Sequence, residues 1–556
     1  MLPAALDTLS DFLDIRGAGS DAGALRNAAA AIRQLQPAEA AAFVRRARAG
    51  QMDGVPLIGP AVQSHLRSIL AGDPAAAIDA ARAGIPQLLG RLLDLGIVST
   101  REAAALVRQQ AVATLSDLQA ALADGRVTQF GVPDFERRLR AGAVALAQEL
   151  RPVPLGRATD LLEEVAAAVA RCCSAVDLVT AAGGVRRFES LVDGLVLVGR
   201  APDPAAAVEV LTMAAAIDDV LYRTGRRAIL LVQQTEVDIR IAAPDDYGTV
   251  LFTATGSPAH LRGVHARRGR PPLAASEDVV YAHAGLPFIP PELREGDGEI
   301  EAAAAGRLPA LVQRQDIRGD LHMHTTSSDG ADTLAAMVAA CAALGYEYIA
   351  ITDHSERAAA GRTLTRSALA RQREEIEALR ERYPLMRILH GIEVDIMPDG
   401  RLDFEDAVLE PLDLVLASLH DPAHQDARTL TRRCLKAIRH PLVNVITHPA
   451  NRLVGRRPGY ALDFDEVFAA AAETGTALEV DGAPSHLDLD GALARRAIAA
   501  GATLTIDSDC HRARALQRQM TLGIGTARRG WVEARHVLNA RPVAEVLAFV
   551  AAKRRH

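Results

Sequence analysis

The sequence predicts a chain of several domains: a helical N-terminal region, a central α+β region and a C-terminal parallel α/β barrel. Its 556 residues are enough for two to four domains. The barrel is predicted by a series of short apolar runs in the C-terminal half, most of which are followed directly by His, Asp or Glu. The other two regions are predicted by Ala-rich helical spacing up to residue 150 and by strand-like apolar runs after it.

Residues 1–150 have the composition and spacing of short helices. The stretch 38–48 is rich in Ala, with apolar residues at helical intervals. Residues 56–62 and 130–133 are similar to the turn of a helix-hairpin-helix, whose backbone N–H groups hold a phosphate. That turn usually has Gly where Leu57 stands, so an ordinary helix–helix turn is an equal alternative. We predict a degenerate DNA-binding region of helices.

Residues 151–298 differ in character, because strand-like runs replace the Ala-rich helices. Apolar runs stand at 195–198 and 228–232, and residues 236–241 alternate as a half-buried strand does. The next stretch, 299–317, has no strand pattern and few bulky apolar side chains after its start. We therefore predict a partly helical linker between domains there.

The barrel domain is predicted at residues 318–556. Its first motif contains His322 and His324, which alternate across one residue, so both imidazoles point to the same face of a strand. Two imidazoles aimed at one point are a potential pair of metal ligands. Parallel strands end at one rim of a barrel, where barrel enzymes keep their chemistry. We expect the side chains of these strand-end motifs to gather at that rim: His322, His324, Asp329, Asp353, His354, Glu393, His420, His448, Asp507, Asp509 and His511.

Composition and charge argue against several classes of protein. No apolar run in the sequence approaches the length of a membrane span, and the N-terminus lacks the basic segment and apolar core of a signal peptide. Five cysteines without framework spacing indicate reduced thiols, so we expect a cytoplasmic protein, and we expect a monomer. The net charge of −7 opposes tight non-specific binding of nucleic acid.

Four segments of the central region resemble family X DNA polymerases. Residues 183–193 resemble their nucleotidyltransferase motif, and 237–240 resemble the strand that carries a third catalytic aspartate. Residues 247–260 resemble the segment that cradles the incoming nucleotide, and 281–295 resemble the end of the thumb. From Gly319 onward the chain resembles the PHP phosphoesterase domain that is fused to bacterial family X polymerases. The resemblance implies a nucleotidyltransferase-like palm and thumb, followed by a distorted (β/α)7 PHP barrel.

The polymerase-like motif departs from the family where its metal chemistry resides. Family X polymerases hold two Mg²⁺ ions with three aspartates, two of them in an Asp-x-Asp pair on one strand. Here the pair reads Asp193-Gly194-Leu195, and an apolar side chain cannot bind Mg²⁺. An alignment shifted by one residue would need another carboxylate nearby, and we find no candidate. We predict a vestigial site of Asp193, Asp238 and Arg186, with Mg²⁺ as the ion it would take.

Other positions of this half indicate the same loss. The family's nucleotide-binding Gly-Ser is Gly183-Gly184, and the Tyr-Phe pair that reads the sugar is Thr253-Ala254. The chain has two lysines, Lys436 and Lys553, both in the C-terminal domain. The lyase step of many family X N-terminal domains needs a lysine amine for its Schiff base, and a guanidinium that stays protonated cannot replace it. We expect feeble or absent nucleotide addition and no lysine-dependent lyase step.

The resemblance to PHP domains implies two or three divalent metal ions, held by nine side chains. The implied ligands are His322, His324, Asp329, His354, Glu393, His420, His448, Asp509 and His511. Glu393 is expected to bridge two ions, and Glu393, Asp509 and His420 are expected to be catalytic. Mixed imidazole and carboxylate ligands suit Zn²⁺, Mn²⁺ or Fe²⁺. The remaining histidines of this domain, His486 among them, are interpreted as bystanders.

A basic cluster follows His448 in the sequence. Arg452, Arg456 and Arg457 are predicted to contact phosphates that flank the scissile one. The alternative is that these are solvated surface arginines with no ligand.

The strand-end motifs and the resemblance to PHP domains of family X polymerases together imply a metal-dependent phosphoesterase that processes DNA 3′ ends as a 3′–5′ exonuclease in DNA repair. Its partner would be DNA at ends, gaps or a primer–template. Three alternatives remain open: an active family X repair polymerase with an exonuclease domain, a small-molecule phosphatase of the histidinol-phosphate type, and a non-catalytic scaffold that binds DNA ends. The large N-terminal half argues against the small-molecule phosphatase, and the full ligand set argues against the scaffold.

Overall fold

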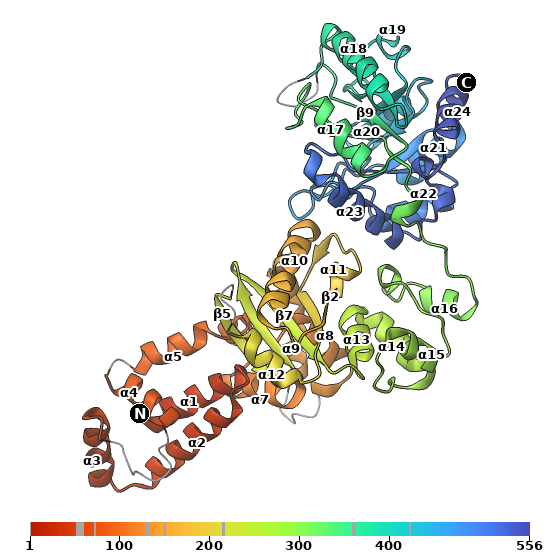
Figure 1. The fold of residues 1–556 in the computed structure, drawn as a ribbon. Coiled ribbons are helices and arrows are strands. Elements are labelled where there is room, and N and C mark those ends of the chain that lie inside the picture. The colour runs from red at the N-terminus through yellow and green to blue at the C-terminus, as the bar shows by residue number, and fades with distance from the viewer. Residues whose placement is uncertain are drawn as a thin grey trace.

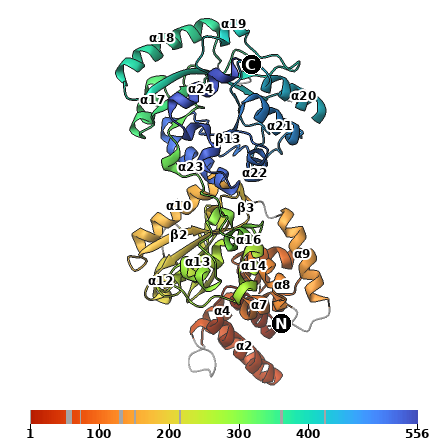
Figure 2. The same ribbon diagram turned by 90° about the vertical axis from the view of Figure 1, so that its right-hand side faces the viewer.

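The structure, a computed structural model, follows the predicted order of domains. Figures 1 and 2 show N-terminal helices, then a sheet with helices, then a C-terminal α/β domain. This arrangement confirms the predicted fold class. Residues 56–59 of the turn predicted at 56–62 and all of the turn predicted at 130–133 lie outside the described residues, and residues 60–62 begin α4 (Pro60–Ala71). The structure describes residues 2–51, 60–71, 74–127, 134–149, 152–213, 217–357, 363–421 and 424–555.

Helices with reciprocal caps make up part of the N-terminal region. The Ser99 hydroxyl accepts the Glu102 N–H while the Glu102 carboxylate accepts the Ser99 N–H, so donors of the first turn of α7 are satisfied. Thr114 and Asp117 form the same pair at the start of α8. No helix in the described part of the chain is long and apolar enough to cross a membrane. The helices are α1 (Leu2–Ile15), α2 (Gly19–Gln34), α3 (Pro37–Arg48), α4 (Pro60–Ala71), α5 (Pro74–Ala83), α6 (Gln87–Asp94), α7 (Thr100–Gln110), α8 (Leu115–Ala123) and α9 (Phe135–Glu149).

In the described part of the chain, a five-stranded sheet forms the centre of the middle region, in the order β2-β4-β7-β6-β5. Strands β4 and β7 are parallel, and the other neighbours are antiparallel. Val165 of α10 and Val208 of α12 belong to the hydrophobic cluster on one face, and Tyr222 and Ile229 pack with the N-terminal helices. The elements are β1 (Val153–Pro154), α10 (Leu155–Cys172), β2 (Leu178–Ala182), α11 (Gly183–Arg186), β3 (Leu191–Val192), β4 (Leu195–Arg200), α12 (Pro204–Leu211), β5 (Asp219–Thr224), β6 (Arg227–Val232), β7 (Thr235–Ala242), α13 (Tyr247–Thr255), α14 (Pro258–Arg268), α15 (Glu277–His283) and η2 (Pro291–Leu293).

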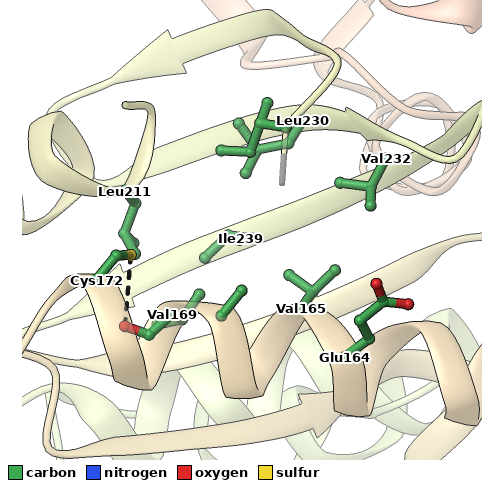
Figure 3. Close-up of a pocket in the computed structure, with 10 residues that line it drawn as sticks. Glu164, Val165, Val169, Cys172, Leu211, Leu230, Val232 and Ile239 are labelled. Atoms are coloured by element: carbon green, nitrogen blue, oxygen red, sulfur yellow. Dashed lines mark hydrogen bonds between the residues drawn. The ribbon is translucent and has the colours of Figure 1, made fainter. Parts of the chain in front are cut away.

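A cavity of about 20 Å³ lies between α10 and this sheet, where Val165 and Val169 face Leu230 (Figure 3). The side chains that line it are apolar apart from Glu164 and Cys172. The Cys172 thiol donates to the Val169 carbonyl at 3.6 Å. A space this small with an apolar lining is a packing gap between a helix and a sheet.

The segment predicted to be a linker packs against the helices before it. Helix α16 (Glu299–Ala304) places Ile300 in one hydrophobic cluster with Tyr281. The Glu299 carboxylate is buried, and its Oε1 lies 2.6 Å from His260 Nδ1. Separating this pair would leave a buried charge without its partner, so the start of the segment is fixed to the middle region.

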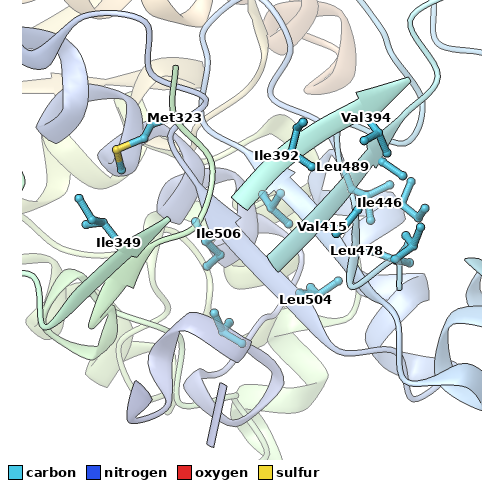
Figure 4. Packing of buried hydrophobic residues seen from close by; sticks show 14 of the residues in the cluster. Met323, Ile349, Ile392, Val394, Val415, Ile446, Leu478, Leu489, Leu504 and Ile506 are labelled. Carbon is cyan, nitrogen blue, oxygen red and sulfur yellow. The ribbon is translucent and has the colours of Figure 1, made fainter. Parts of the chain in front are cut away.

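In the described residues, the C-terminal domain contains a nearly closed barrel of seven parallel strands in sequence order. A parallel bridge between Met323 and Cys510 joins the chain beyond β8 to the chain beyond β14. Ile392, Val415 and Ile506 pack in its hydrophobic core (Figure 4). The elements are η3 (Arg314–Asp316), β8 (Gly319–Asp320), α17 (Leu334–Ala343), β9 (Tyr348–Ile351), α18 (Arg366–Arg382), β10 (Arg387–Asp395), α19 (Asp406–Leu409), β11 (Leu414–Ser418), α20 (Ala427–Ile438), β12 (Val445–Ile446), α21 (Phe464–Thr474), β13 (Ala477–Asp481), α22 (Gly491–Ala499), β14 (Leu504–Asp507), η4 (Ala513–Ala515), α23 (Leu516–Arg529), η5 (Ala534–His536), η6 (Leu538–Ala540) and α24 (Val543–Lys553).

Alternation along the barrel strands places charged residues above an apolar floor. Leu389 of β10 and Ala477 of β13 form a buried cluster with Val546 of α24. Side chains on one face of a strand recur every second residue. Counting onward by twos from these floor residues leads to Glu393 on β10 and to Glu479 on β13, and both are buried.

The barrel domain packs directly on the middle region through α23, which faces it in Figure 2. Arg518 of α23 donates at 2.8 Å to each oxygen of Asp160 in α10, and Arg529 donates to Glu295 at 2.6 Å. Leu522 of α23 belongs to the hydrophobic cluster of α10. The two halves of the chain therefore share both ion pairs and apolar packing.

The tightest part of this contact gives a test. A Cβ atom at Gly525 of α23 would lie 1.9 Å from a carbon of the Phe188 ring. We expect Gly525→Ala to push the ring and the helix apart and to destabilise the protein by about 1–3 kcal/mol. Gly90 of α6 is the matched control, because a Cβ there meets nothing within 4 Å. Gly90→Ala should stabilise by about 0.5–1 kcal/mol through its helix propensity. Differential scanning calorimetry compares them, and an unchanged transition in Gly525→Ala would refute the contact.

Candidate metal centre

The nine predicted ligands lie at one rim of the barrel, where the carboxyl ends of its parallel strands meet. Each stands after a strand or near its end. They are His322, His324 and Asp329 after β8, His354 after β9, Glu393 in β10, His420 after β11, His448 after β12, and Asp509 and His511 after β14.

The Glu393 carboxylate is the centre of this cluster. Its Oε1 lies 3.1 Å from His448 Nε2 and 3.4 Å from His420 Nε2. Its Oε2 lies 2.9 Å from His354 Nδ1 and 3.4 Å from His322 Nε2. The side chain is buried, so both carboxylate oxygens are surrounded by imidazoles in place of water. A carboxylate that bridges two metal ions needs this arrangement.

The other predicted ligands form two groups around Asp509 and Asp329. His324 Nε2 lies 3.0 Å from Asp509 Oδ1, and His511 Nε2 lies 3.3 Å from Asp329 Oδ1. His324 also has a ligand atom within 4.8 Å of those of Asp329, His354 and His511. The structure therefore brings His324 close to both groups.

Carboxylates behind the histidines determine which ring nitrogen faces the centre. His322 Nδ1 lies 2.7 Å from Glu479 Oε1, and Glu479 Oε2 accepts the backbone N–H of His448 at 2.7 Å. His420 Nδ1 pairs with Asp395 in the same way. An imidazole that donates from Nδ1 keeps its lone pair on Nε2, where a metal ion can bind. Sequence reasoning missed Glu479, although a carboxylate at an inward position of an apolar strand points to such a role.

Burial and neighbouring charges shift the pKa values of the rim side chains in opposite directions. Burial alone would raise the pKa of Glu393, but His354, His420 and His322 outweigh it and hold that pKa well below its ordinary value. Burial alone would lower the pKa of His420, but Glu393 and Asp395 raise it to about 9. Protons on the imidazoles therefore balance the charge of the buried carboxylates.

The donor set fits divalent metal ions. Nδ1 of His324 and Nδ1 of His448 are buried without a hydrogen-bond partner among the described residues. His448 and Asp509 have φ values of 27° and 48°, a region that residues with a side chain rarely adopt. The fold thus holds a strained backbone at two of the predicted ligands. Imidazole and carboxylate donors together could hold Zn²⁺, Mn²⁺ or Fe²⁺.

A cavity of about 330 Å³ opens above the cluster. Besides predicted ligands, the residues that line it include Asn451, Arg457 and His486. Sequence reasoning missed Asn451 and interpreted His486 as a bystander. Both lie in loops after β12 and β13, and the sequence gives no pattern that distinguishes them from other polar loop residues.

The three arginines predicted to contact phosphates occupy different environments. Arg457 lines the cavity, and its Nε is buried without a hydrogen-bond partner among the described residues. Arg452 Nε donates to the His486 carbonyl at 2.8 Å, so its guanidinium holds the loop after β13. Arg456 is exposed. Of the three, Arg457 is the one with a free donor beside the metal-ligand cluster.

The sheet of the middle region corrects the predicted alignment of the lost polymerase carboxylates. On the parallel strands β4 and β7, Asp238 is registered against Val196, whereas Leu195 is registered against Val237. Registered residues on adjacent strands point to the same face of the sheet, so Val196 lies beside Asp238. Gly194, two residues before Val196, is on that same face. Leu195 instead belongs to the apolar cluster of α10. The prediction was one residue out, and neither Gly194 nor Val196 carries a carboxylate.

Asp238 lies in a closed set of ion pairs. Arg227 Nε is 2.7 Å from Asp238 Oδ1, and Arg240 Nη2 is 2.9 Å from Asp238 Oδ2. Arg227 Nη2 also reaches Asp117 of α8 at 2.8 Å. Asp238 is 4% exposed, whereas Asp193 is exposed just before β4. Two arginines and two aspartates therefore neutralise one another under an N-terminal helix.

Arg186, the third residue of the predicted vestigial site, lies in α11 and joins it to α13 and α15. Its Nη2 lies 2.7 Å from Glu277 Oε2, and its Nη1 donates to the Thr255 hydroxyl at 2.9 Å. Glu277 also pairs with the buried Arg294. Burial would raise the pKa of Glu277, but the two arginines lower it. Arg186 therefore contributes to the packing of this half.

Metal uptake by the barrel should release protons. His420 and His511 are partly buried, and nearby carboxylates raise the pKa of each to about 9, so both imidazoles are protonated at pH 7. A histidine ligand must lose its proton to bind a metal ion. Affinity should therefore fall as pH drops from 9 to 6, by about tenfold per pH unit for each proton released. Calorimetric titration of the metal-stripped chain with Mn²⁺, in buffers of different ionisation enthalpy, counts those protons, and none released at pH 7 would refute the proton balance.

The ion pairs of Asp238 predict the sign of a stability change. Removing one member of a buried ion-pair set leaves the others uncompensated, so Asp238→Asn should destabilise the protein by about 3–5 kcal/mol. A carboxylate crowded against other metal-binding aspartates would behave in the opposite way, because its removal relieves repulsion. Asp193→Asn is the matched control at an exposed position. Calorimetry should show a lower melting temperature for Asp238→Asn alone, and a raised one would contradict the ion-pair role.

Comparison with known proteins gives both partial and full-length matches. The PHP domain family matches residues 320–479. The DNA polymerase/3′-5′ exonuclease PolX of Bacillus subtilis is 32% identical over 569 residues, covering 98% of each chain. A probable phosphatase of Thermoanaerobacter sp. is 30% identical over 203 residues, which cover 34% of this chain and 78% of that protein. A solved histidinol phosphate phosphatase from Lactococcus lactis, complexed with zinc, L-histidinol and phosphate, is 20% identical, covers 38% of this chain and 93% of its own, and has a TM-score of 0.32.

The Bacillus subtilis match extends along the helical region, the sheet and the barrel alike, because it covers 98% of both chains. An identity of 32% over that length is enough to assign a family. The PHP match identifies the barrel domain within it. This chain therefore belongs to the PolX family of DNA polymerase/3′-5′ exonucleases, in which a polymerase half is fused to a PHP phosphoesterase domain.

Proposed function

We propose that the protein is a metal-dependent phosphoesterase that removes nucleotides from DNA 3′ ends. The observation that carries the proposal is the Glu393 carboxylate, buried among imidazoles below a cavity of about 330 Å³. Membership of the PolX family supports DNA as the substrate, in preference to a small phosphate ester. The cavity is open, which suits a strand end better than an enclosed pocket would.

We further propose that the nine rim residues hold two or three ions of Zn²⁺, Mn²⁺ or Fe²⁺. Bound ions of this kind supply a hydroxide near neutral pH and neutralise phosphate oxygens. Glu393, Asp509 and His420 line the cavity and would lie nearest the reacting phosphate. Glu479 keeps His322 in one tautomer and orientation. These contacts hold the donors in place before a substrate arrives.

Arg457 is proposed to bind a phosphate of the DNA strand beside the one that is cut. Its Nη2 donates to the Asn451 carbonyl at 2.8 Å, which fixes the guanidinium against the cavity wall. The side chain is partly exposed at the cavity, and its Nε has no hydrogen-bond partner among the described residues. A fixed guanidinium with a spare donor suits a phosphate oxygen.

We propose that the polymerase-like half adds no nucleotides at a useful rate, so that no Mg²⁺ is held at Asp238. Gly194 and Val196 offer no carboxylate on the face of Asp238. Arg227 and Arg240 already neutralise the one that remains. Two-metal phosphoryl transfer needs several carboxylates with open coordination positions. This half would then serve to hold the rim of the barrel and to position DNA.

A DNA strand labelled at its 5′ end tests the proposal. With Mn²⁺, the full chain should shorten the strand from its 3′ end one nucleotide at a time. Glu393→Gln should lower the rate by more than about 100-fold, or ~2.7 kcal/mol of transition-state stabilisation. Asp399→Asn is the matched control, because Asp399 is an exposed carboxylate paired with Arg401, and it should keep the wild-type rate. Hydrolysis of histidinol phosphate without any shortening of DNA would overturn the proposal in favour of the small-molecule alternative.

A further inference from the structure

The rim of the barrel contains a group of potential ligands outside the nine predicted ones. Asp481, His486 and Asp509 each offer one ligand atom, and these atoms lie within 4.8 Å of one another. Asp481 ends β13, and His486 lies in the loop that follows. Asp481 and Asp507 are registered partners on adjacent strands, which places Asp481 at the level of the metal-ligand cluster.

The Asp481 carboxylate is buried and only half satisfied. Its Oδ1 accepts the Ala483 N–H at 2.5 Å. Its Oδ2 is fully enclosed and has no hydrogen-bond partner among the described residues. The neighbouring Asp509 and Glu479 side chains are also carboxylates, and their negative charges disfavour ionisation of the Asp481 carboxyl group. Buried carboxylates are normally paired with a cation or bound to a metal ion, so Oδ2 lacks the partner that its position requires.

His486 supplies a lone pair at the same place. Its Nδ1 lies 2.9 Å from the Arg452 carbonyl, which can only accept, so the proton is on Nδ1 and the lone pair is on Nε2. The ring stacks on that of His448, with centroids 5.3 Å apart and an interplanar angle of 23°. It also lines the cavity above the cluster. Arg452 holds the loop from the other side by donating to the His486 carbonyl at 2.8 Å.

We propose that Asp481, His486 and Asp509 form an additional site for a divalent transition-metal ion, which shares Asp509 with the proposed nine-residue set. Two carboxylates and one imidazole are a donor set that suits Mn²⁺, Fe²⁺ or Zn²⁺. Three protein ligands leave coordination positions open, and the cavity gives access to water or to a phosphate oxygen.

The polymerase-like half supports the loop that carries this site. A Cβ atom at Gly156 of α10 would lie 2.5 Å from the Pro484 side chain, so the helix approaches the loop closely. Within the barrel domain, the Val454 N–H donates to the Ser485 carbonyl at 2.8 Å, which also fixes this loop. The additional ion would therefore lie on the side of the cluster nearest the other half of the chain.

Metal content tests the site without any DNA. The full chain is stripped of metal, reloaded with Mn²⁺, desalted and measured by mass spectrometry of the metal. Asp481→Asn and His486→Gln should each hold one ion fewer per chain than the wild type. Asp399→Asn and His440→Gln are the matched controls away from the rim, since Asp399 pairs with Arg401 and His440 with Asp406, and they should hold the same number as the wild type. Equal metal content in all five proteins would overturn the proposal.

A variant that loses several ions would have disturbed the shared Asp509, so its metal content would not test the additional site alone. A second measurement, on the wild type, then tests that site. Anomalous diffraction at the manganese edge should show a peak about 2.0–2.3 Å from Asp481 Oδ2 and His486 Nε2. Peaks beside Glu393 with none at Asp481 would overturn the proposal. Because neither measurement uses DNA, failure of the proposed exonuclease function and failure of this site remain distinguishable.

Discussion

Burial of the Glu393 carboxylate among histidines is the constraint on which the barrel domain depends. A carboxylate that water cannot reach must be paired, and parallel strands supply imidazoles to it from several neighbours at once. The apolar floor formed with α24 keeps water out from below, which strengthens every charge interaction above it. Glu479 and Asp395 then hold the rings in orientation. The same burial that makes the arrangement costly without cations would favour the binding of cations that we propose.

In the polymerase-like half, by contrast, the buried acidic side chains of Asp238 and Glu277 are paired with arginines. Asp238 is closed off by Arg227 and Arg240, and Arg186 is committed to Glu277. These pairs hold the sheet, an N-terminal helix, α11 and α15 together, so these side chains contribute to packing. Helix α10 of this half contacts α23 and the loop around Pro484, and so packs against the rim of the barrel. The family fold is thereby kept, while its chemistry is proposed to be concentrated in one domain.

Much of the fold was predictable because parallel strands end at one rim, so strand-end motifs such as those of His354 and His420 indicated both the barrel and its functional edge. The ligand roles of those residues stay predictions. Alignment by motif placed the lost carboxylate at Leu195, because a one-residue shift changes the face of a strand and only the pairing of Val196 with Asp238 reveals it. Glu479 and Asp481 of β13 were missed, although an inward carboxylate on an apolar strand points to a role beside the histidines, as Glu393 of β10 shows. His486 could not be recognised, since its position depends on a loop held by Arg452.

We propose that the barrel performs the phosphodiester chemistry of the whole chain. The full-length double variant with His322→Ala and His324→Ala tests this proposal. This variant lacks two of the proposed ligands, while the sheet with Asp238 is untouched. It is given a labelled primer–template, Mn²⁺ and all four dNTPs, and product lengths are resolved to single nucleotides. We predict that the primer is neither shortened nor lengthened. Template-directed extension at the rate of an ordinary repair polymerase would show that the polymerase-like half is active and that the closed ion pairs of Asp238 have been misread.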